Sequence, residues 1–302
     1  MTEHIENIQQ PDEASETGDA LDLTNLRVLR NILLAHGMRP NKSFGQNFLI
    51  DRAVLSKIVE AAELSEQDEV LEVGAGTGVL TRELARYAKH VVAVELERDM
   101  LTLLRKTTSH LHNVALIERN LLSFNPVESF GQASYKLVAN LPYYITAAAL
   151  RYFLEHEHAP SLLVVMVQWE VAQRIVAEPG DLSLFAVSVQ LYGKPRIMAR
   201  VPAQAFYPAP KVDSAILRVD VRKELPLLFD ERDRFFRVVQ AGFCQARKQL
   251  HNSLTHGLHC KNTQVREWLA LANIEANRRA ETLTLDEWLR LWRVVETATS
   301  SQ

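Results

Sequence analysis

The sequence predicts an α/β protein: a large first part built on a mostly parallel seven-stranded sheet, and a small all-helical domain after it. Three observations predict this. Strand and helix patterns alternate between residues 69 and 221, a glycine-rich turn follows the first of those strands, and no strand pattern occurs after residue 231. Alternation of this kind gives parallel strands covered by helices on both faces.

The first 24 residues are acidic, with seven Asp or Glu and no Lys or Arg. They have neither a basic start nor an apolar core, so we expect a disordered tail at 1–23 rather than a secretory signal. The net charge of −3 is therefore misleading: without residues 1–24 the chain has 34 basic and 30 acidic residues, or +4. Any affinity for nucleic acid must then come from local patches.

Two helices precede the sheet. Thr24 is predicted to cap a helix at 25–36 that ends at Gly37, and Asp51 to cap a second helix that ends near residue 62. Between them lies a basic, glycine-containing loop at 39–49, RPNKSFGQNFL.

Seven strands and five intervening helices follow. The strands are predicted at 69–73, 90–95, 114–118, 136–139, 162–167, 196–201 and 214–220. The helices are predicted at 79–88, 100–107, 146–156, 169–176 and 184–192. No helix separates the last two strands, so we expect an antiparallel edge there. Ligands of such sheets bind beyond the carboxyl ends of the strands.

A linker near Pro226 leads to the helical domain, with helices predicted at 232–243, 247–256, 262–272 and 285–297. The expected division is therefore a tail at 1–23, an α/β domain at 24–222 and a helical domain at 223–302.

Residues 70–78, VLEVGAGTG, run from a strand through three glycines into a helix. Gly74 and Gly76 let the backbone turn tightly and let a ligand approach the main chain. The spacing differs from the G-x-G-x-x-G of dinucleotide sites, which disfavours a nicotinamide cofactor. Glu95 ends the next strand, where a carboxylate can accept both ribose hydroxyls. A nucleoside cofactor is predicted; an ordinary turn beside a surface Glu is the alternative.

The tetrapeptide Asn140-Leu141-Pro142-Tyr143 follows another apolar strand. The amide oxygen of Asn140 and the carbonyl of Pro142 can each accept an N–H, and the ring of Tyr143 offers a stacking face. This combination indicates a site for a base that carries an exocyclic amino group.

The composition disfavours membrane proteins, secreted proteins and zinc proteins. With 47% apolar residues and no apolar stretch near the ~20 residues of a membrane span, we expect a soluble, cytoplasmic protein. Cys244 and Cys260, the two cysteines, indicate a reducing compartment. The spacing of these cysteines and the nearby histidines matches no standard zinc pattern, so we expect no metal site.

Five motifs occur in an order that resembles a known family: residues 44–49 (FGQNFL), the glycine turn, Glu95, residues 140–143 (NLPY) and residues 206–214 (FYPAPKVDS). Between about residues 24 and 292 the chain resembles the rRNA adenine N6-dimethyltransferases of the KsgA/RsmA group. The resemblance implies a Rossmann-like class I methyltransferase domain with S-adenosyl-L-methionine as methyl donor. It implies as substrate two adjacent adenosines near the 3′ end of 16S rRNA in the small ribosomal subunit or its precursor, and a role in ribosome biogenesis. A monomer is expected.

Site roles follow from the resemblance. The residues expected to bind the cofactor are Asn47, Leu49, Gly74, Gly76, Glu95, Asn120 and Asn140. Asn120 stands where the family usually has Asp, and would accept from the adenine amino group of the cofactor through an uncharged oxygen.

The catalytic residues are expected to be Asn140, Pro142, Tyr143 and Phe206. Tyr143 and Phe206 would sandwich the target adenine; the alternative for Phe206 is a core aromatic between two prolines. Tyr144 and Trp169 replace the Asn and Lys that are usual in the family.

Four basic residues are candidates for RNA contact, although charged stretches often form only a solvated surface. Arg39, Lys42, Arg247 and Lys248 are the basic residues expected to contact RNA, with the last two placed at the start of a helix.

Three other functions remain open. The same motifs occur in macrolide-resistance methyltransferases that act on 23S rRNA, although residues 278–283 (RRAETL) resemble the KsgA group more closely. A DNA adenine methyltransferase would more typically have two prolines after the Asn. A ribosome-assembly protein that binds without transferring methyl groups is opposed by the intact NLPY, while Asn120 leaves it open.

Overall fold

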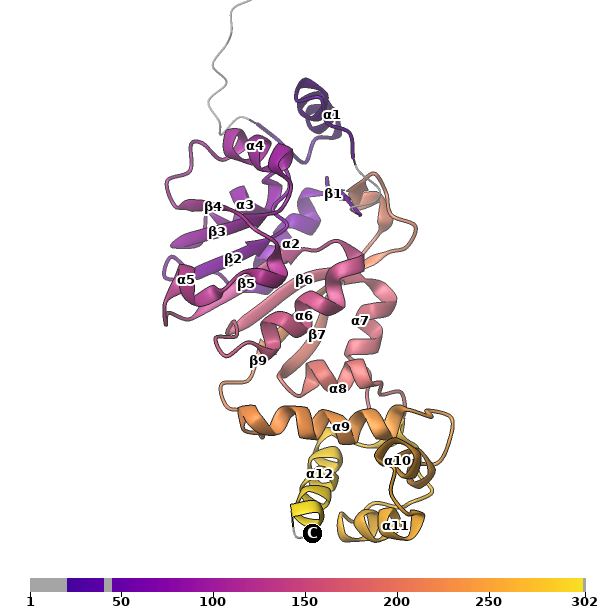
Figure 1. Ribbon diagram of the computed structural model, residues 1–302. Coiled ribbons are helices and arrows are strands. Elements are labelled where there is room, and N and C mark those ends of the chain that lie inside the picture. The colour runs from indigo at the N-terminus through magenta and orange to yellow at the C-terminus, as the bar shows by residue number, and fades with distance from the viewer. Residues whose placement is uncertain (1–20, 41–44, 301–302) are drawn as a thin grey trace, which may run out of the picture.

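The computed structural model describes residues 21–40 and 45–300 (Figure 1). Lys42 and most of the expected acidic tail therefore lie outside the described residues. A seven-stranded sheet has the order β4-β3-β2-β5-β6-β9-β7, in which the first five strands are parallel and β9 and β7 are antiparallel to their neighbours. The predicted fold class and the antiparallel edge are confirmed.

The strands agree closely with the predicted ranges. They are β2 (Glu69–Val73), β3 (His90–Glu95), β4 (Val114–Glu118), β5 (Tyr135–Asn140), β6 (Leu162–Gln168), β7 (Gly193–Val201) and β9 (Ser214–Val221). In β6 every residue from Leu162 to Val167 is buried, as expected for a strand covered on both faces.

Helices occupy both faces of the sheet. Those of the first part are α1 (Leu26–Ala35), α2 (Arg52–Ala62), α3 (Val79–Leu84), α4 (Arg98–Thr107), α5 (Pro126–Phe130), α6 (Thr146–Glu155), α7 (Trp169–Ile175) and α8 (Leu184–Gln190). Within the described residues no helix is long and apolar enough to cross a membrane.

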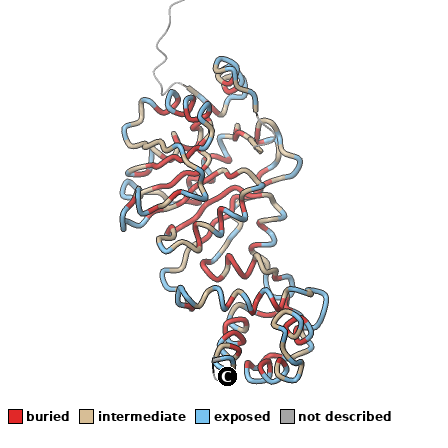
Figure 2. Tube along the Cα trace, in the orientation of Figure 1, coloured by how far each residue is buried: buried red, intermediate tan, exposed pale blue. Residues whose placement is uncertain are grey.

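The last four helices are α9 (Arg232–Phe243), α10 (Leu250–Leu258), α11 (Asn262–Leu271) and α12 (Leu285–Ser300). They lie together at one end of the molecule, with α9 next to α8 (Figure 1). Their buried side chains, such as Phe235 and Trp288, belong to the same hydrophobic cluster as one face of the sheet, and Figure 2 shows burial continuing across the junction. The proposed boundary near residue 222 thus falls within a continuous core.

Four local predictions were wrong. Asn25 rather than Thr24 caps α1, because its side chain accepts from Arg27 N and Val28 N while the Thr24 hydroxyl donates to Asp22. α3 ends at Leu84 rather than near residue 88, and α10 begins at Leu250, so Arg247 and Lys248 lie in the preceding turn. The short helix α5 was not predicted.

A second, two-stranded sheet was also not predicted. β1 (Phe48–Leu49) pairs antiparallel with β8 (Phe206–Tyr207), with Leu49 opposite Phe206. The two motifs at 44–49 and 206–214, far apart in the sequence, therefore lie side by side.

Candidate active site

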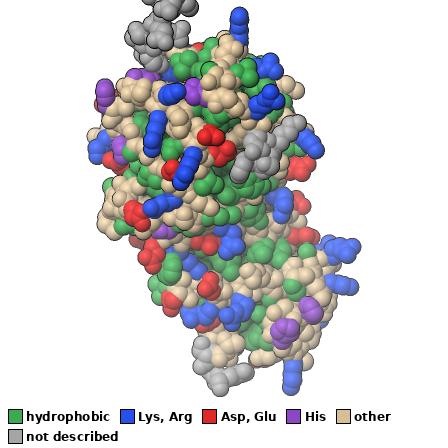
Figure 3. Space-filling view, turned by 45° about the horizontal axis from the view of Figure 1, so that its top comes forward, with side chains coloured by type: hydrophobic (Ala, Val, Ile, Leu, Met, Phe, Trp, Pro, Cys, Tyr) green, Lys and Arg blue, Asp and Glu red, His purple; other side chains and the backbone are tan. Residues whose placement is uncertain are grey.

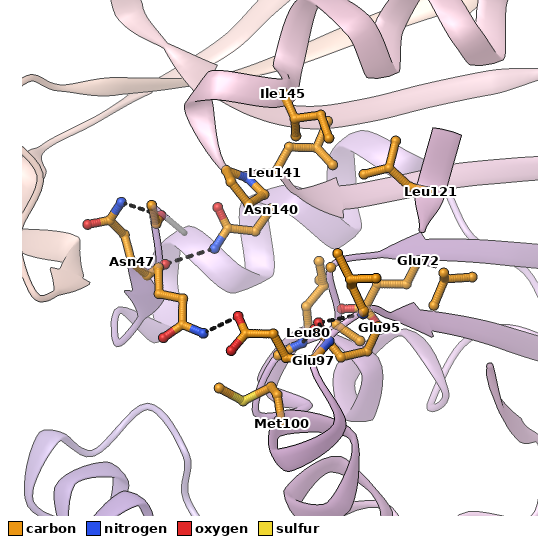
Figure 4. Close-up of a pocket in the computed structure, with 18 of the residues that line it drawn as sticks. Asn47, Glu72, Leu80, Glu95, Glu97, Met100, Leu121, Asn140, Leu141 and Ile145 are labelled. Carbon is orange, nitrogen blue, oxygen red and sulfur yellow. Dashed lines mark hydrogen bonds between the residues drawn. The ribbon is translucent and has the colours of Figure 1, made fainter. Parts of the chain in front are cut away.

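A cavity of about 280 Å³ lies at the carboxyl ends of β2, β3 and β5 (Figure 4). The predicted residues that line it are Asn47, Leu49, Gly74, Gly76, Glu95, Asn120, Asn140, Pro142 and Tyr143. The structure thus brings together all the predicted cofactor residues and three of the four predicted catalytic ones.

The glycine turn lies directly against the NLPY segment. Gly74 has a φ of +71° and Gly76 a φ of +57°, a backbone conformation that L side chains rarely adopt. A Cβ added to Gly74 would lie 3.9 Å from Pro142 Cδ and 4.0 Å from the main-chain oxygen of Asn140. A ligand held by the glycine turn therefore has the NLPY segment as its neighbour.

Glu95 is fixed by main-chain N–H groups. Its Oε2 accepts from Gly76 N at 2.9 Å, and its Oε1 accepts from Leu96 N at 2.7 Å and Glu97 N at 3.0 Å. A carboxylate has about four acceptor positions, so roughly one remains for a ligand. The side chain is 8% exposed, which leaves its charge largely shielded from water.

Glu97, two residues further on, was not predicted as a site residue. It lines the cavity and accepts from Gln46 Nε2 at 2.7 Å, and Figure 4 shows this contact beside Glu95. Burial raises the pKa of the Glu97 carboxyl. The second acid of the E-L-E sequence after β3 was a signal that could have identified it.

Glu72 is a second carboxyl that the sequence analysis did not single out. It is 1% exposed at the cavity wall, and its Oε2 has no hydrogen-bond partner among the described residues. Burial, with the nearby charge of Glu95, raises the pKa of Glu72 to about 8. Its carboxyl is therefore largely protonated at neutral pH.

The amide of Asn140 is held in one orientation. Its Nδ2 donates to the main-chain oxygen of Asn47 at 3.2 Å, and Asn47 Nδ2 in turn donates to Gly45 O at 2.9 Å (Figure 4). Because the amide nitrogen is engaged, the amide oxygen remains as an acceptor on the cavity side of β5.

The carbonyl of Pro142, which the sequence analysis treats as an acceptor, already has one donor. It accepts from Ile145 N at 3.1 Å, closing the 3₁₀ turn η4 (Tyr143–Ile145) that leads into α6. Leu141 also lines the cavity, and its carbonyl accepts no hydrogen bond from any described residue. Leu141 therefore offers a second main-chain acceptor, one residue before the predicted one.

Tyr143 is anchored through its hydroxyl. The hydroxyl lies 2.6 Å from Ser214 Oγ at the start of β9, and burial raises the pKa of Tyr143. Tyr144, by contrast, is 65% exposed, and its ring lies 3.5 Å from where a Cβ on Gly45 would be. One aromatic ring is fixed in the wall while the next stands at the mouth.

Asn120 joins the cavity from the end of β4. Its Oδ1 accepts from Leu122 N at 3.0 Å and so caps η3 (Leu121–Ser123). This bond fixes the side chain and leaves its Nδ2 and one lone pair of Oδ1 unused.

Phe206 does not line the cavity. It is 3% exposed and packs in the hydrophobic cluster that also contains Leu49 and Ile216. In this conformation its ring offers no open face to a base, which favours the core reading of this residue.

The basic residues expected to contact RNA do not form one patch. Arg39 is exposed after α1, whereas Arg247 and Lys248 are exposed between α9 and α10 at the opposite end (Figure 1). Figure 3 shows Lys and Arg dispersed over the face in view, with acidic side chains between them. Trp169, which replaces the Lys that is usual in the family, lies under the guanidinium of Arg200. The guanidinium carbon is 4.9 Å from the centre of the Trp169 ring.

Comparison with known proteins gives consistent results. The family model described as ribosomal RNA adenine dimethylase matches residues 37–296. A ribosomal RNA small subunit methyltransferase A from Dehalococcoides mccartyi is 45% identical over 87% of this chain and 90% of its own. The protein of the same name from Clostridioides difficile is 37% identical over 93% and 99%.

Among solved structures, the 23S rRNA methyltransferase ErmE is 28% identical with a TM-score of 0.67, covering 83% of this chain and all of its own. A dimethyladenosine transferase from Plasmodium falciparum has a TM-score of 0.70 at 24% identity, over 84% of this chain and 98% of its own, and supports the fold.

Proposed function

The chain belongs to the ribosomal RNA adenine dimethylase family, and from this membership we propose how its site works and which RNA it modifies. The protein is an S-adenosyl-L-methionine-dependent rRNA adenine dimethyltransferase. Its substrate is proposed to be two adjacent adenosines near the 3′ end of 16S rRNA, in a small subunit that is still being assembled.

The cavity residues fit the methyl donor. The remaining acceptor position of Glu95 suits one ribose hydroxyl, and Asn120 suits the adenine amino group. Gly74 and Gly76, together with the walls formed by Asn47 and Leu49, would hold the rest of the molecule. When bound, the donor supplies a methyl group on a positively charged sulfur.

The target amino group would be held by two acceptors. The Asn140 amide oxygen and the Leu141 carbonyl would each accept one of the two N–H groups of adenine N6. The lone pair of this nitrogen is conjugated with the ring, so holding both hydrogens lets the nitrogen pyramidalise and direct that pair at the methyl carbon. A new bond from this nitrogen to the methyl carbon would form as that carbon's bond to sulfur breaks, and the proton on nitrogen would then leave to water. No general base is needed.

The ring of Tyr143 would support the flipped base. Its hydroxyl contact with Ser214 keeps the ring in place without using its face, so the ring can stack on an adenine turned out of its helix or loop. Pro142 contributes by packing against the glycine turn and fixing the start of η4. A role for Phe206 as second stacking ring would require it to leave the core.

One observation carries this proposal: the oriented amide of Asn140 and the glycine turn share a single cavity. The test is to incubate the protein with labelled donor and undermethylated small or large subunits, and then to map the modified base. Dimethyladenosine in 16S rRNA alone is expected. Modification of 23S rRNA would identify the resistance-type activity, and no transfer to either subunit would favour a binding protein.

The choice of small-subunit rRNA rests on relatedness. The relatives named small subunit methyltransferase A are 45% and 37% identical, against 28% for the 23S rRNA methyltransferase. We further propose that the protein acts as a cytoplasmic monomer during subunit maturation.

A further inference from the structure

A second cavity, of about 690 Å³, lies between α6, α8 and α9. Four arginines line it, together with aromatic rings that include Tyr192 and Phe229. The arginines are Arg151, Arg174, Arg232 and Arg237. We call this site the arginine cavity. Neither the methyl-transfer chemistry nor the predicted RNA contacts involve it.

Arg232 is held between two rings. Its guanidinium carbon lies 4.6 Å from the ring centre of Phe229 and 5.5 Å from that of Tyr192, and its Nη1 donates to the main-chain oxygen of Glu155 at 3.0 Å. Its Nε is buried without a partner among the described residues. A guanidinium stacked in this way loses little entropy when it binds a ligand.

Arg174 and Arg237 are exposed, and neither forms an ion pair or hydrogen bond with any residue that the structure describes. Arg151 is largely neutralised, because it pairs with Glu155 at 2.9 Å. Asp233 is the remaining acid of the lining. The cavity is therefore positively charged, with two guanidinium groups available to an anion.

The arginine cavity is connected to the methyl-transfer site by one helix. α6 begins at Thr146, immediately after η4, and carries Arg151 and Glu155 toward its other end. Its 10 residues span about 15 Å. A strand that delivers an adenosine to Asn140 can thus reach the arginine cavity along α6.

We propose that the arginine cavity binds the phosphate backbone of an unpaired rRNA segment adjacent to the target adenosines, with the exposed ring of Phe229 available to a base of that segment. Arginines beside aromatic faces are the combination that single-stranded RNA binds. This inference rests on the proposed rRNA substrate and adds a contact that anchors it.

The test reverses both available charges. The variant Arg174→Glu/Arg237→Glu is expected to bind undermethylated small subunits, and protein-free 16S rRNA, at least about tenfold more weakly at 0.1 M salt. The slope of log affinity against log salt should fall by about 1.5, because each lost phosphate contact removes about 0.7 to 0.9. Donor affinity, measured by calorimetry, and kcat at saturating subunits should be unchanged.

The control applies the same change of charge elsewhere. Lys57 on α2 and Arg293 on α12 are exposed and line neither the active site nor the arginine cavity, so Lys57→Glu/Arg293→Glu should leave binding within about twofold. Equal losses in both double variants would overturn the proposal, as would unchanged binding in the first. A loss for subunits but not for protein-free rRNA would point to a ribosomal protein instead. If the wild-type protein binds both RNAs but modifies neither, the proposed function fails while the arginine cavity is still tested.

Discussion

The side-chain nitrogen of Asn140 donates to the main-chain oxygen of Asn47, 3.2 Å away, across a gap of 93 residues in the sequence. This bond fixes which end of the amide faces the cavity. It also connects the segment that leads into β1 to the end of β5, so that a wall of the donor site and the proposed acceptor of the target amine are placed by one contact.

Replacing Asn140 with Ala is expected to lower kcat by about 10² or more, because one of the two acceptors that orient the target nitrogen is lost. Donor affinity should change little, since Glu95 and the glycine turn remain. Transfer to undermethylated small subunits and calorimetry with the donor measure the two quantities. Near-wild-type kcat would remove Asn140 from the mechanism.

Replacing Glu95 with Ala should mainly weaken donor binding, by about 10- to 100-fold, the effect of losing a hydrogen bond to a charged group. The matched control is Glu97→Gln, which keeps the shape of a nearby acid that makes no main-chain contact within the described part of the chain and should bind the donor within a few-fold. Calorimetric titration compares them, and equal affinity of Glu95→Ala and the wild type would contradict the ribose contact.

Glu72 should make folding stability depend on pH. Its pKa is about 8 when folded and about 4.5 when unfolded, so above pH 4.5 the unfolded chain releases a proton that the folded chain keeps. Its contribution is therefore favourable at low pH and is lost progressively as the pH rises toward 8, at up to about 1.4 kcal/mol per pH unit. Glu72→Gln should gain stability relative to the wild type between pH 6 and pH 8.

Urea unfolding of both proteins at these two pH values measures the difference. If the difference in the free energy of unfolding between the two proteins is the same at both pH values, Glu72 ionises normally in the folded protein.

Gly78→Ala should destabilise the folded protein. Gly78 has a φ of +86°, and an added Cβ would lie 2.8 Å from Leu104 Cδ1 and 2.9 Å from Thr107 Oγ1. Gly37→Ala is the control, with a φ of +66° and no atom within 4 Å of the added Cβ. Both variants have the cost of the left-handed conformation, about 1–2 kcal/mol, and Gly78→Ala should lose clearly more through its contacts. Thermal unfolding compares them, and similar losses would mean that α4 moves aside easily.

Much of the fold could be predicted because the strands are long apolar runs, such as Leu162–Gln168, and each ends at a recognisable turn. β1 and β8 have two residues each, too few to show a period. α5 has only five residues and begins directly after Asn125, so its sequence pattern resembles that of a loop.

Most of the site could be predicted because chemistry-bearing residues follow the strands directly. The sequence does not predict which hydrogen-bond partner each polar atom of the site has. The Pro142 carbonyl accepts a hydrogen bond from Ile145 N in a local turn, and the Glu95 carboxylate accepts from three main-chain N–H groups. Phe206 is buried where β8 pairs with β1, and the arginine cavity brings together α6 and α9, which lie far apart in the sequence. Both features depend on tertiary packing.

Because β1 pairs with β8, a movement of one of these strands also changes the position of the other. Leu49 forms part of the donor wall, and its partner Phe206 is an aromatic ring that the proposed base-stacking role would require outside the core. Because each strand of this pair has only two residues, separating the strands requires little free energy. Separating it would release the ring and loosen the donor pocket in a single event, so that admission of the RNA and retention of the methyl donor would become coupled steps.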